Sequence, residues 1–137
     1  MNKKEQRQAV KEKCNGKCAY CETPLGEKFH VDHLIPVRRI HEYHPKRGFI
    51  PTGKMENPEM DCFENMLPSC ASCNIAKSSM PLEHFREIVE DKLTQLERES
   101  NYRMAKRYGM IIEKPKKIVF YFEKLKLEMK KWKMNMD

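Results

Sequence analysis

The apolar positions with the clearest helical spacing lie in the second half of the chain. They form a stripe made up of Leu82, Phe85, Ile88, Val89, Leu93 and Leu96. This spacing predicts a helix that packs on the core with one face. Ser79 can cap that helix, and Pro81 is tolerated in its first turn. A shorter helix is expected over residues 2–13, where Asn2 and Glu5 form a capping-box pair.

Other stretches favour strands. Residues 29–34 alternate between apolar and polar side chains, which predicts a strand with His30 and Asp32 on one face. His33 has the opposite parity, so Asp32 and His33 can share a site only where this strand bends or ends. Met66-Leu67 is a candidate return strand, and residues 118–122 form a β-prone run.

Between these strands the pattern becomes irregular. Residues 36–61 contain several prolines and glycines and are predicted to form a long loop. A helix is expected to begin near Cys73 and to carry Asn74 and Lys77 one turn apart on one face. The sequence therefore predicts an α+β fold with an N-terminal helix, a C-terminal helix and a short final strand.

Length and composition limit the possibilities further. A chain of 137 residues with 39% hydrophobic and 34% charged residues is expected to form one compact domain with a small core that needs a staple. It has no apolar run long enough to span a bilayer and no secretory signal, so we expect a cytoplasmic protein without membrane contact. In that compartment six cysteines indicate metal ligands rather than disulfides.

Charge is unevenly distributed. Residues 1–101 carry 16 basic and 16 acidic side chains, whereas residues 102–137 carry 11 basic and 4 acidic ones, which accounts for the net charge of +7. We expect the second segment to be a basic extension packed on the first. Such an excess favours nucleic acid as a partner, although a solvated lysine-rich tail is the alternative. The candidate contacts in the loop and the extension are Arg38, Arg39, Lys116 and Lys117.

Two Cys-x-x-Cys pairs stand out among the cysteines. Cys18 and Cys21 form the first pair, and Cys70 and Cys73 form the second. Two such knuckles complete the tetrahedral thiolate shell of a structural zinc ion. The sequence therefore predicts one zinc ion that ties the start of the domain to the helix after Cys70. Cys14 and Cys62, outside the pairs, are interpreted as small buried residues or free thiols.

Three short motifs follow the first cysteine pair, and two of them abut the second pair. They are Val31-Asp32-His33-Leu34-Ile35-Pro36, Glu64-Asn65-Met66-Leu67-Pro68-Ser69-Cys70 and Cys73-Asn74-Ile75-Ala76-Lys77. In this order they resemble the HNH nuclease family, also called ββα-metal nucleases, over about residues 14–80. The resemblance implies a small ββα-metal core within residues 1–101. The gap between His33 and Asn65 looks long for the family, and Asn57 is a second candidate in that region.

The resemblance and the residue chemistry imply the same roles. Asp32 and Asn74 would hold one divalent cation such as Mg²⁺ or Mn²⁺ through oxygen atoms. His33 would be the general base, with Asn65 helping to orient it. Lys77 would contact a phosphate oxygen. Parts for His30, His41 and His44 stay open.

The sequence thus predicts a metal-dependent endonuclease that cuts DNA. The alternative is a zinc-ribbon-like nucleic-acid binding module without catalysis, which explains the cysteines and the charge but leaves Asp32, His33 and Asn74 as a coincidence. The pattern does not choose between a monomer and a weak dimer.

Overall fold

The structure is a computed structural model that describes residues 1–127 and residue 129. It combines helices with two small antiparallel sheets, so the predicted α+β class is confirmed. In chain order the elements are α1 (Lys3–Glu12), β1 (His30–His33), β2 (Arg39–His44), β3 (Gly48–Met55), η1 (Pro58–Met60), η2 (Phe63–Asn65), β4 (Met66–Ser69), α2 (Ala71–Lys77), α3 (Leu82–Glu90), α4 (Lys92–Leu96), α5 (Ser100–Arg107) and α6 (Tyr121–Lys124).

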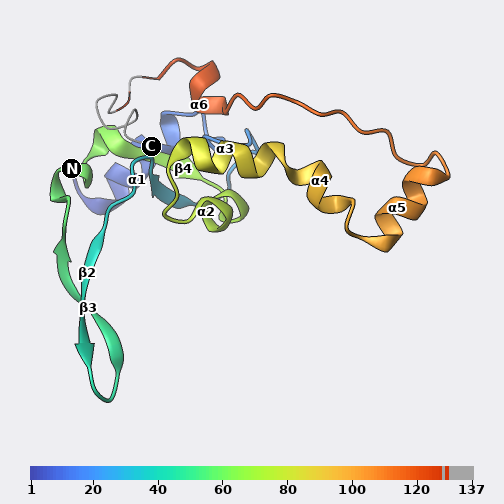
Figure 1. Cartoon of the computed structure of the whole chain (residues 1–137). Coiled ribbons are helices and arrows are strands. Elements are labelled where there is room, and N and C mark those ends of the chain that lie inside the picture. The colour runs from blue at the N-terminus through green and yellow to red at the C-terminus, as the bar shows by residue number, and fades with distance from the viewer. Residues whose placement is uncertain (128, 130–137) are drawn as a thin grey trace.

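The centre of the molecule is a β-β-α unit. Strand β1 pairs antiparallel with β4, with His30 opposite Ser69 and His33 opposite Met66. Helix α2 follows β4 directly and packs on β1, while α1 packs on β4 (Figure 1). The predicted strand at 29–34 and its return strand are both present, although β4 is longer than the expected pair of residues.

Helix α1 begins and ends as its sequence predicts. The Asn2 side chain accepts a hydrogen bond from the Glu5 backbone N–H, and the Glu5 carboxylate accepts one from the Asn2 backbone N–H. After the helix, Asn15 and Gly16 adopt positive φ values of 55° and 75°. Glycine takes up such a left-handed conformation without steric strain, which is why Asn15-Gly16 ends the helix.

The region expected to be a long irregular loop is largely ordered as strands. Residues 39–44 and 48–55 form the antiparallel β2–β3 hairpin, which extends away from the rest of the molecule (Figure 1). The prediction was wrong because the prolines and glycines were interpreted as strand breakers. In the structure Pro51 lies within β3, and Gly48 starts that strand with a φ of 74°.

The helix expected after Ser79 is shorter than its apolar stripe. It divides into α3 and α4 at Asp91, and the residue at the N-cap of α3 is Pro81 rather than Ser79. Helices α4 and α5 then form an arm that projects from the core, and an extended segment returns from its tip (Figure 1). Only the first part of the stripe is deeply buried, at Leu82 and Phe85.

The strand expected at 118–122 is absent, and the short helix α6 begins at Tyr121 instead. Phe120 and Phe122 are buried and Val119 is exposed, so burial alternates along the β-prone run although no strand forms. The run lies along the first cysteine knuckle, where the N–H of Phe122 donates to the carbonyl of Ala19 at 2.8 Å. That knuckle is a loop, so no strand pairing develops.

An aromatic cluster joins this returning segment to the core. Phe85 and Phe120 stack with ring centroids 5.3 Å apart, and Tyr20 meets Phe85, Phe120 and Phe122 edge to face. The chain after residue 101 therefore contributes to the same core as the chain before it. The expected boundary at 101/102 falls inside α5, and residues 128 and 130–137 of the expected extension lie outside the described part.

Among the described residues, no helix has both the length and the apolar content that a membrane crossing requires.

Candidate functional site

The four cysteines of the two predicted pairs come together. The Sγ atoms of Cys18, Cys21, Cys70 and Cys73 all lie within 4.8 Å of one another, and those of Cys21 and Cys70 are 3.8 Å apart. With Zn–S bonds of about 2.3 Å, a tetrahedral zinc ion separates its sulfur ligands by about 3.8 Å. The cluster thus fits a metal ion such as zinc. Cys14 and Cys62 do not belong to it.

Backbone geometry prepares these sulfurs for a cation. Cys70 is the N-cap of α2 and accepts a hydrogen bond from the Cys73 N–H, while its own N–H donates to the Cys18 Sγ, both at 3.4 Å. A hydrogen bond from the Cys73 thiol, followed by backbone N–H groups, lowers the pKa of Cys18 to about 4. That same bond is the main reason why the pKa of Cys73 is raised. A cation would allow further thiolates to form.

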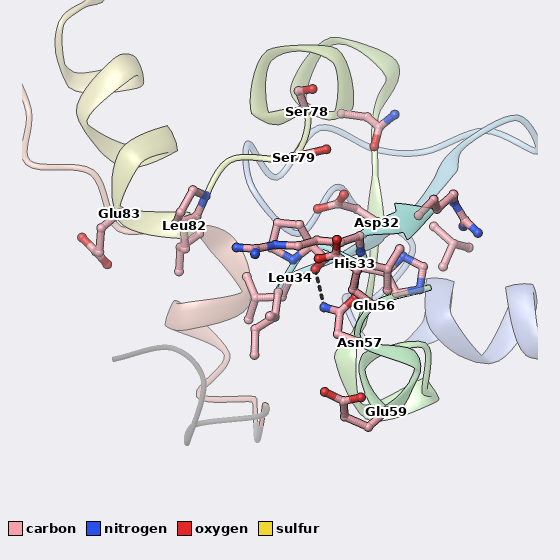
Figure 2. Close-up of a pocket in the computed structure, with 18 of the residues that line it drawn as sticks. Asp32, His33, Leu34, Glu56, Asn57, Glu59, Ser78, Ser79, Leu82 and Glu83 are labelled. Atoms are coloured by element: carbon pink, nitrogen blue, oxygen red, sulfur yellow. Dashed lines mark hydrogen bonds between the residues drawn. The ribbon is translucent and has the colours of Figure 1, made fainter. Parts of the chain in front are cut away.

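A groove of about 920 Å³ is lined by three of the other predicted site residues. Asp32 and His33 at the end of β1 line it, as does Asn74 on α2. Figure 2 shows Asp32 and His33 in the middle of the groove, between Ser78 and Ser79 on one side and Asn57 and Glu59 on the other. Because β1 ends at His33, the opposite strand parity of Asp32 and His33 does not separate them.

The Asp32 carboxylate is buried and held by two donors. Its Oδ2 accepts a short hydrogen bond from the Tyr20 hydroxyl and lies 3.2 Å from the Lys77 Nζ. Burial, and then the neighbouring Asp32 charge, raise the pKa of Tyr20 well above its usual value. Tyr20 is therefore a neutral donor that fixes the carboxylate. Tyr20 was not predicted as a site residue, although its position between Cys18 and Cys21 places it next to the predicted zinc ligands.

Lys77 does not occupy the position expected of a phosphate contact. Its side chain is fully buried, and its Nζ donates to the carbonyl of His33 at 3.2 Å in addition to pairing with Asp32. The spacing of Asn74 and Lys77 was correct, but the lysine faces inward beneath β1. The ammonium group balances the charge of Asp32 instead of meeting a ligand.

The His33 ring has a partner that the sequence did not suggest. Its Nε2 lies 2.9 Å from an Asp61 carboxylate oxygen. Asp61 follows η1 and is about 40% exposed, whereas the His33 side chain is about 17% exposed. Because Asp61 is 28 residues away in the chain and belongs to no motif, only the fold brings the two together.

Asn65 acts on the backbone rather than on the His33 ring. Its side chain is completely buried, accepts a hydrogen bond from the Ile35 N–H and donates to the carbonyls of Ile35 and Met60, at 2.8–2.9 Å. Asn65 can therefore influence the orientation of His33 only through the backbone. Asn65 fixes the segments that follow His33 and precede Asp61. Asn57, the other candidate, makes a similar connection between Pro36 and Arg38.

The predicted basic contacts separate into two groups. Arg38 and Arg39 line the groove, and so does His41. Lys116 and Lys117 are exposed but line a different cavity of about 420 Å³ next to Tyr20. His30 is exposed on β1 and does not line the groove.

The fold and the site thus define an α+β protein with a candidate four-cysteine metal centre and a groove lined by Asp32, His33 and Asn74. Comparisons with protein-family models, with curated proteins and with solved structures find no match for this chain.

Proposed function

We propose that this protein is a metal-dependent endonuclease that hydrolyses phosphodiester bonds in DNA. The observation that supports this most is the common location of Asp32, His33 and Asn74, the residues matched to the HNH motifs, in the lining of one groove. We also propose that Cys18, Cys21, Cys70 and Cys73 bind a structural zinc ion.

The donors in the groove suit a hard divalent cation. Asp32 offers a carboxylate and Asn74 an amide oxygen, and such ions prefer oxygen ligands. When bound, Mg²⁺ or Mn²⁺ would supply charge to the phosphate and its leaving oxygen. Tyr20 and Lys77 hold Oδ2 of Asp32, so Oδ1 is the oxygen proposed to bind the cation.

His33 is proposed to accept a proton from the attacking water. A carboxylate can only accept hydrogen bonds, so Nε2 would carry a proton in its contact with Asp61. Nδ1 is then the nitrogen that takes the proton, and Asp61 stabilises the imidazolium that forms. Asn65 keeps both backbone segments in place while this happens.

The test is incubation of purified protein with supercoiled plasmid DNA in Mg²⁺, in Mn²⁺ and in EDTA. We expect cleavage with a divalent cation and none with EDTA, and ends that DNA ligase can rejoin because the family resemblance implies 5′-phosphate and 3′-hydroxyl products. His33→Ala should abolish cleavage but retain DNA binding, whereas His84→Ala, an exposed histidine on α3, should cut like the wild type.

One observation favours a second candidate function. The Lys77 ammonium group neutralises Asp32, which weakens its attraction for a cation. A nucleic-acid binding module without catalysis has no need of that attraction. Should the wild type bind DNA but leave it intact in every divalent cation tried, this binding function replaces the nuclease proposal.

A further inference from the structure

Most side chains of the β2–β3 hairpin are exposed, and the hairpin pairs with no other strand in the described part of the chain. An isolated two-stranded hairpin has marginal stability in water. This one nevertheless extends well beyond the core (Figure 1). The exposed side chains of the hairpin are therefore available to a partner.

One face of the hairpin presents two large aromatic rings to solvent. Tyr43 and Phe49 are directly opposite each other in the register, with exposed fractions of 67% and 75%. Their ring centroids are 5.6 Å apart in an edge-to-face arrangement. His41 and Pro51 form the next pair on the same face.

The tip of the hairpin presents two positive charges in a defined turn. The Nδ1 of His44 accepts hydrogen bonds from the backbone N–H groups of Lys46 and Arg47, both at 3.2 Å, which shapes the turn. Lys46 and Arg47 are exposed. Residues 39–55 hold four basic side chains and one acidic one, so the hairpin is strongly positive.

The base of the hairpin is continuous with the groove of the candidate site. Arg39 and His41, at the start of β2, line the same groove as Asp32 and His33. Glu56, directly after β3, lines it too. A polyanion engaged in the groove therefore extends naturally along the hairpin.

We propose that the β2–β3 hairpin enters the major groove of double-stranded DNA beside the phosphate engaged at His33, a specification of the substrate that rests on the proposed function. The major groove is about 12 Å wide and admits a two-stranded β-ribbon. Lys46 and Arg47 contact backbone phosphates, and the face with Tyr43 and Phe49 meets the base edges.

Duplex DNA fits this surface better than a single strand does. Single-stranded nucleic acid is held by aromatic faces on which successive bases stack. Here the two rings pack edge to face, so one ring already covers part of the face of the other. A narrow ribbon with charges at its tip is therefore better suited to enter a groove of duplex DNA than to stack against the bases of a single strand.

Binding is tested without cleavage, in the His33→Ala background and without added divalent metal. The probe is a fluorescein-labelled 30-base-pair duplex, and anisotropy is measured at several salt concentrations. Lys46→Glu/Arg47→Glu should weaken binding about tenfold or more and flatten the log–log salt dependence by about two units. Tyr43→Ala/Phe49→Ala should weaken binding about tenfold.

Two control variants match these changes. Lys3→Glu/Lys4→Glu makes the same charge change on α1, and Tyr108→Ala removes an exposed ring from the arm. Both should bind like the parent. The proposal is overturned if the hairpin variants bind duplex like the parent, if the controls lose as much affinity, or if the labelled single strand binds more tightly and loses affinity in Tyr43→Ala/Phe49→Ala.

Failure of the hairpin proposal can be distinguished from failure of the nuclease proposal. A protein that never cuts plasmid but loses duplex affinity in the hairpin variants would refute the catalytic function and keep the hairpin's role. A protein that cuts plasmid while these variants bind normally would refute the hairpin's role alone.

Discussion

A single ammonium group determines the electrostatic balance of the candidate site. Lys77 lies completely buried against Asp32 and the backbone of His33. A buried carboxylate without such a partner is strongly disfavoured. The Lys77 ammonium group thus compensates the negative charge of the Asp32 carboxylate at a position with little access to water.

Replacement of Lys77 by methionine tests this balance. Methionine preserves most of the aliphatic volume but leaves Asp32 buried and unpaired, so Lys77→Met should lower the free energy of unfolding by about 3 kcal/mol. Urea unfolding followed by circular dichroism measures the change. Asp32→Asn/Lys77→Met should be more stable than Lys77→Met alone. A Lys77→Met protein as stable as the wild type would contradict the pairing.

Under the proposed nuclease function, the contact between Asp61 and His33 gives a prediction about catalysis. Asp61→Asn should lower kcat for plasmid cleavage by about tenfold or more with little change in KM, because an amide does not stabilise the imidazolium or select the ring tautomer. Glu56→Gln neutralises another acidic residue lining the groove and should leave kcat unchanged. Equal effects of the two substitutions would show that net charge, rather than orientation of His33, matters.

At the scale of elements, α2 connects the cysteine cluster to the groove. Its N-cap is Cys70, its first turn contains Cys73, and the next residues along it include Asn74 and Lys77. The metal proposed for the cluster would therefore anchor the end of the helix from which the groove residues project.

Loss of one cysteine of the cluster should reveal this dependence. Cys70→Ser is expected to lower the zinc content from about one ion per chain to near zero and to lower the unfolding midpoint, because metal binding and folding are coupled. Inductively coupled plasma mass spectrometry and thermal unfolding provide the readouts. Cys62→Ser, outside the cluster, should retain the metal. A Cys70→Ser protein that keeps its zinc would show that another ligand set holds it.

The sequence predicted elements whose signals are local. The capping box of α1, strand β1 with its return strand and the cysteine cluster depend on short-range patterns. The hairpin was missed because turn residues dominated its composition, and the strand at 118–122 was wrongly predicted because its β-prone residues pack on a loop. The contact of Asp61 with His33 spans 28 residues, and the inward direction of Lys77 depends on its contact with Asp32, 45 residues away. No short motif contains both partners of either contact.

At the scale of the whole molecule, the returning segment is held by a long-range ion pair. Arg86 on α3 donates to both carboxylate oxygens of Glu123 at 2.6–2.8 Å and to the carbonyl of Ile118, and its guanidinium covers the Phe120 ring. These contacts join α3 to α6 across the aromatic cluster. They fix the end of the extended segment that returns from the arm.

This ion pair predicts a pH dependence of stability. Burial raises the pKa of Glu123, but hydrogen bonds from Arg86 and from the Phe120 N–H outweigh it, so the pKa is lowered in the folded state. A lowered pKa adds stability above the unfolded value of about 4.3, and that stability is lost as the pH falls through the folded value. The stability difference between wild type and Glu123→Gln should therefore be constant from pH 7 to 5 and shrink below about pH 4. Urea unfolding across this range measures it, and a difference that stays constant at low pH would contradict the assignment.

The position of Tyr20 and its side chain connect three parts of the structure. It stands between two of the clustered cysteines, its ring fills the aromatic cluster, and its hydroxyl fixes Asp32. Grafting this cysteine knuckle onto another scaffold would therefore require more than the thiols. The scaffold would also need a cavity for the Tyr20 ring and a carboxylate to accept its hydroxyl, because the loop sequence alone would leave the ring unburied.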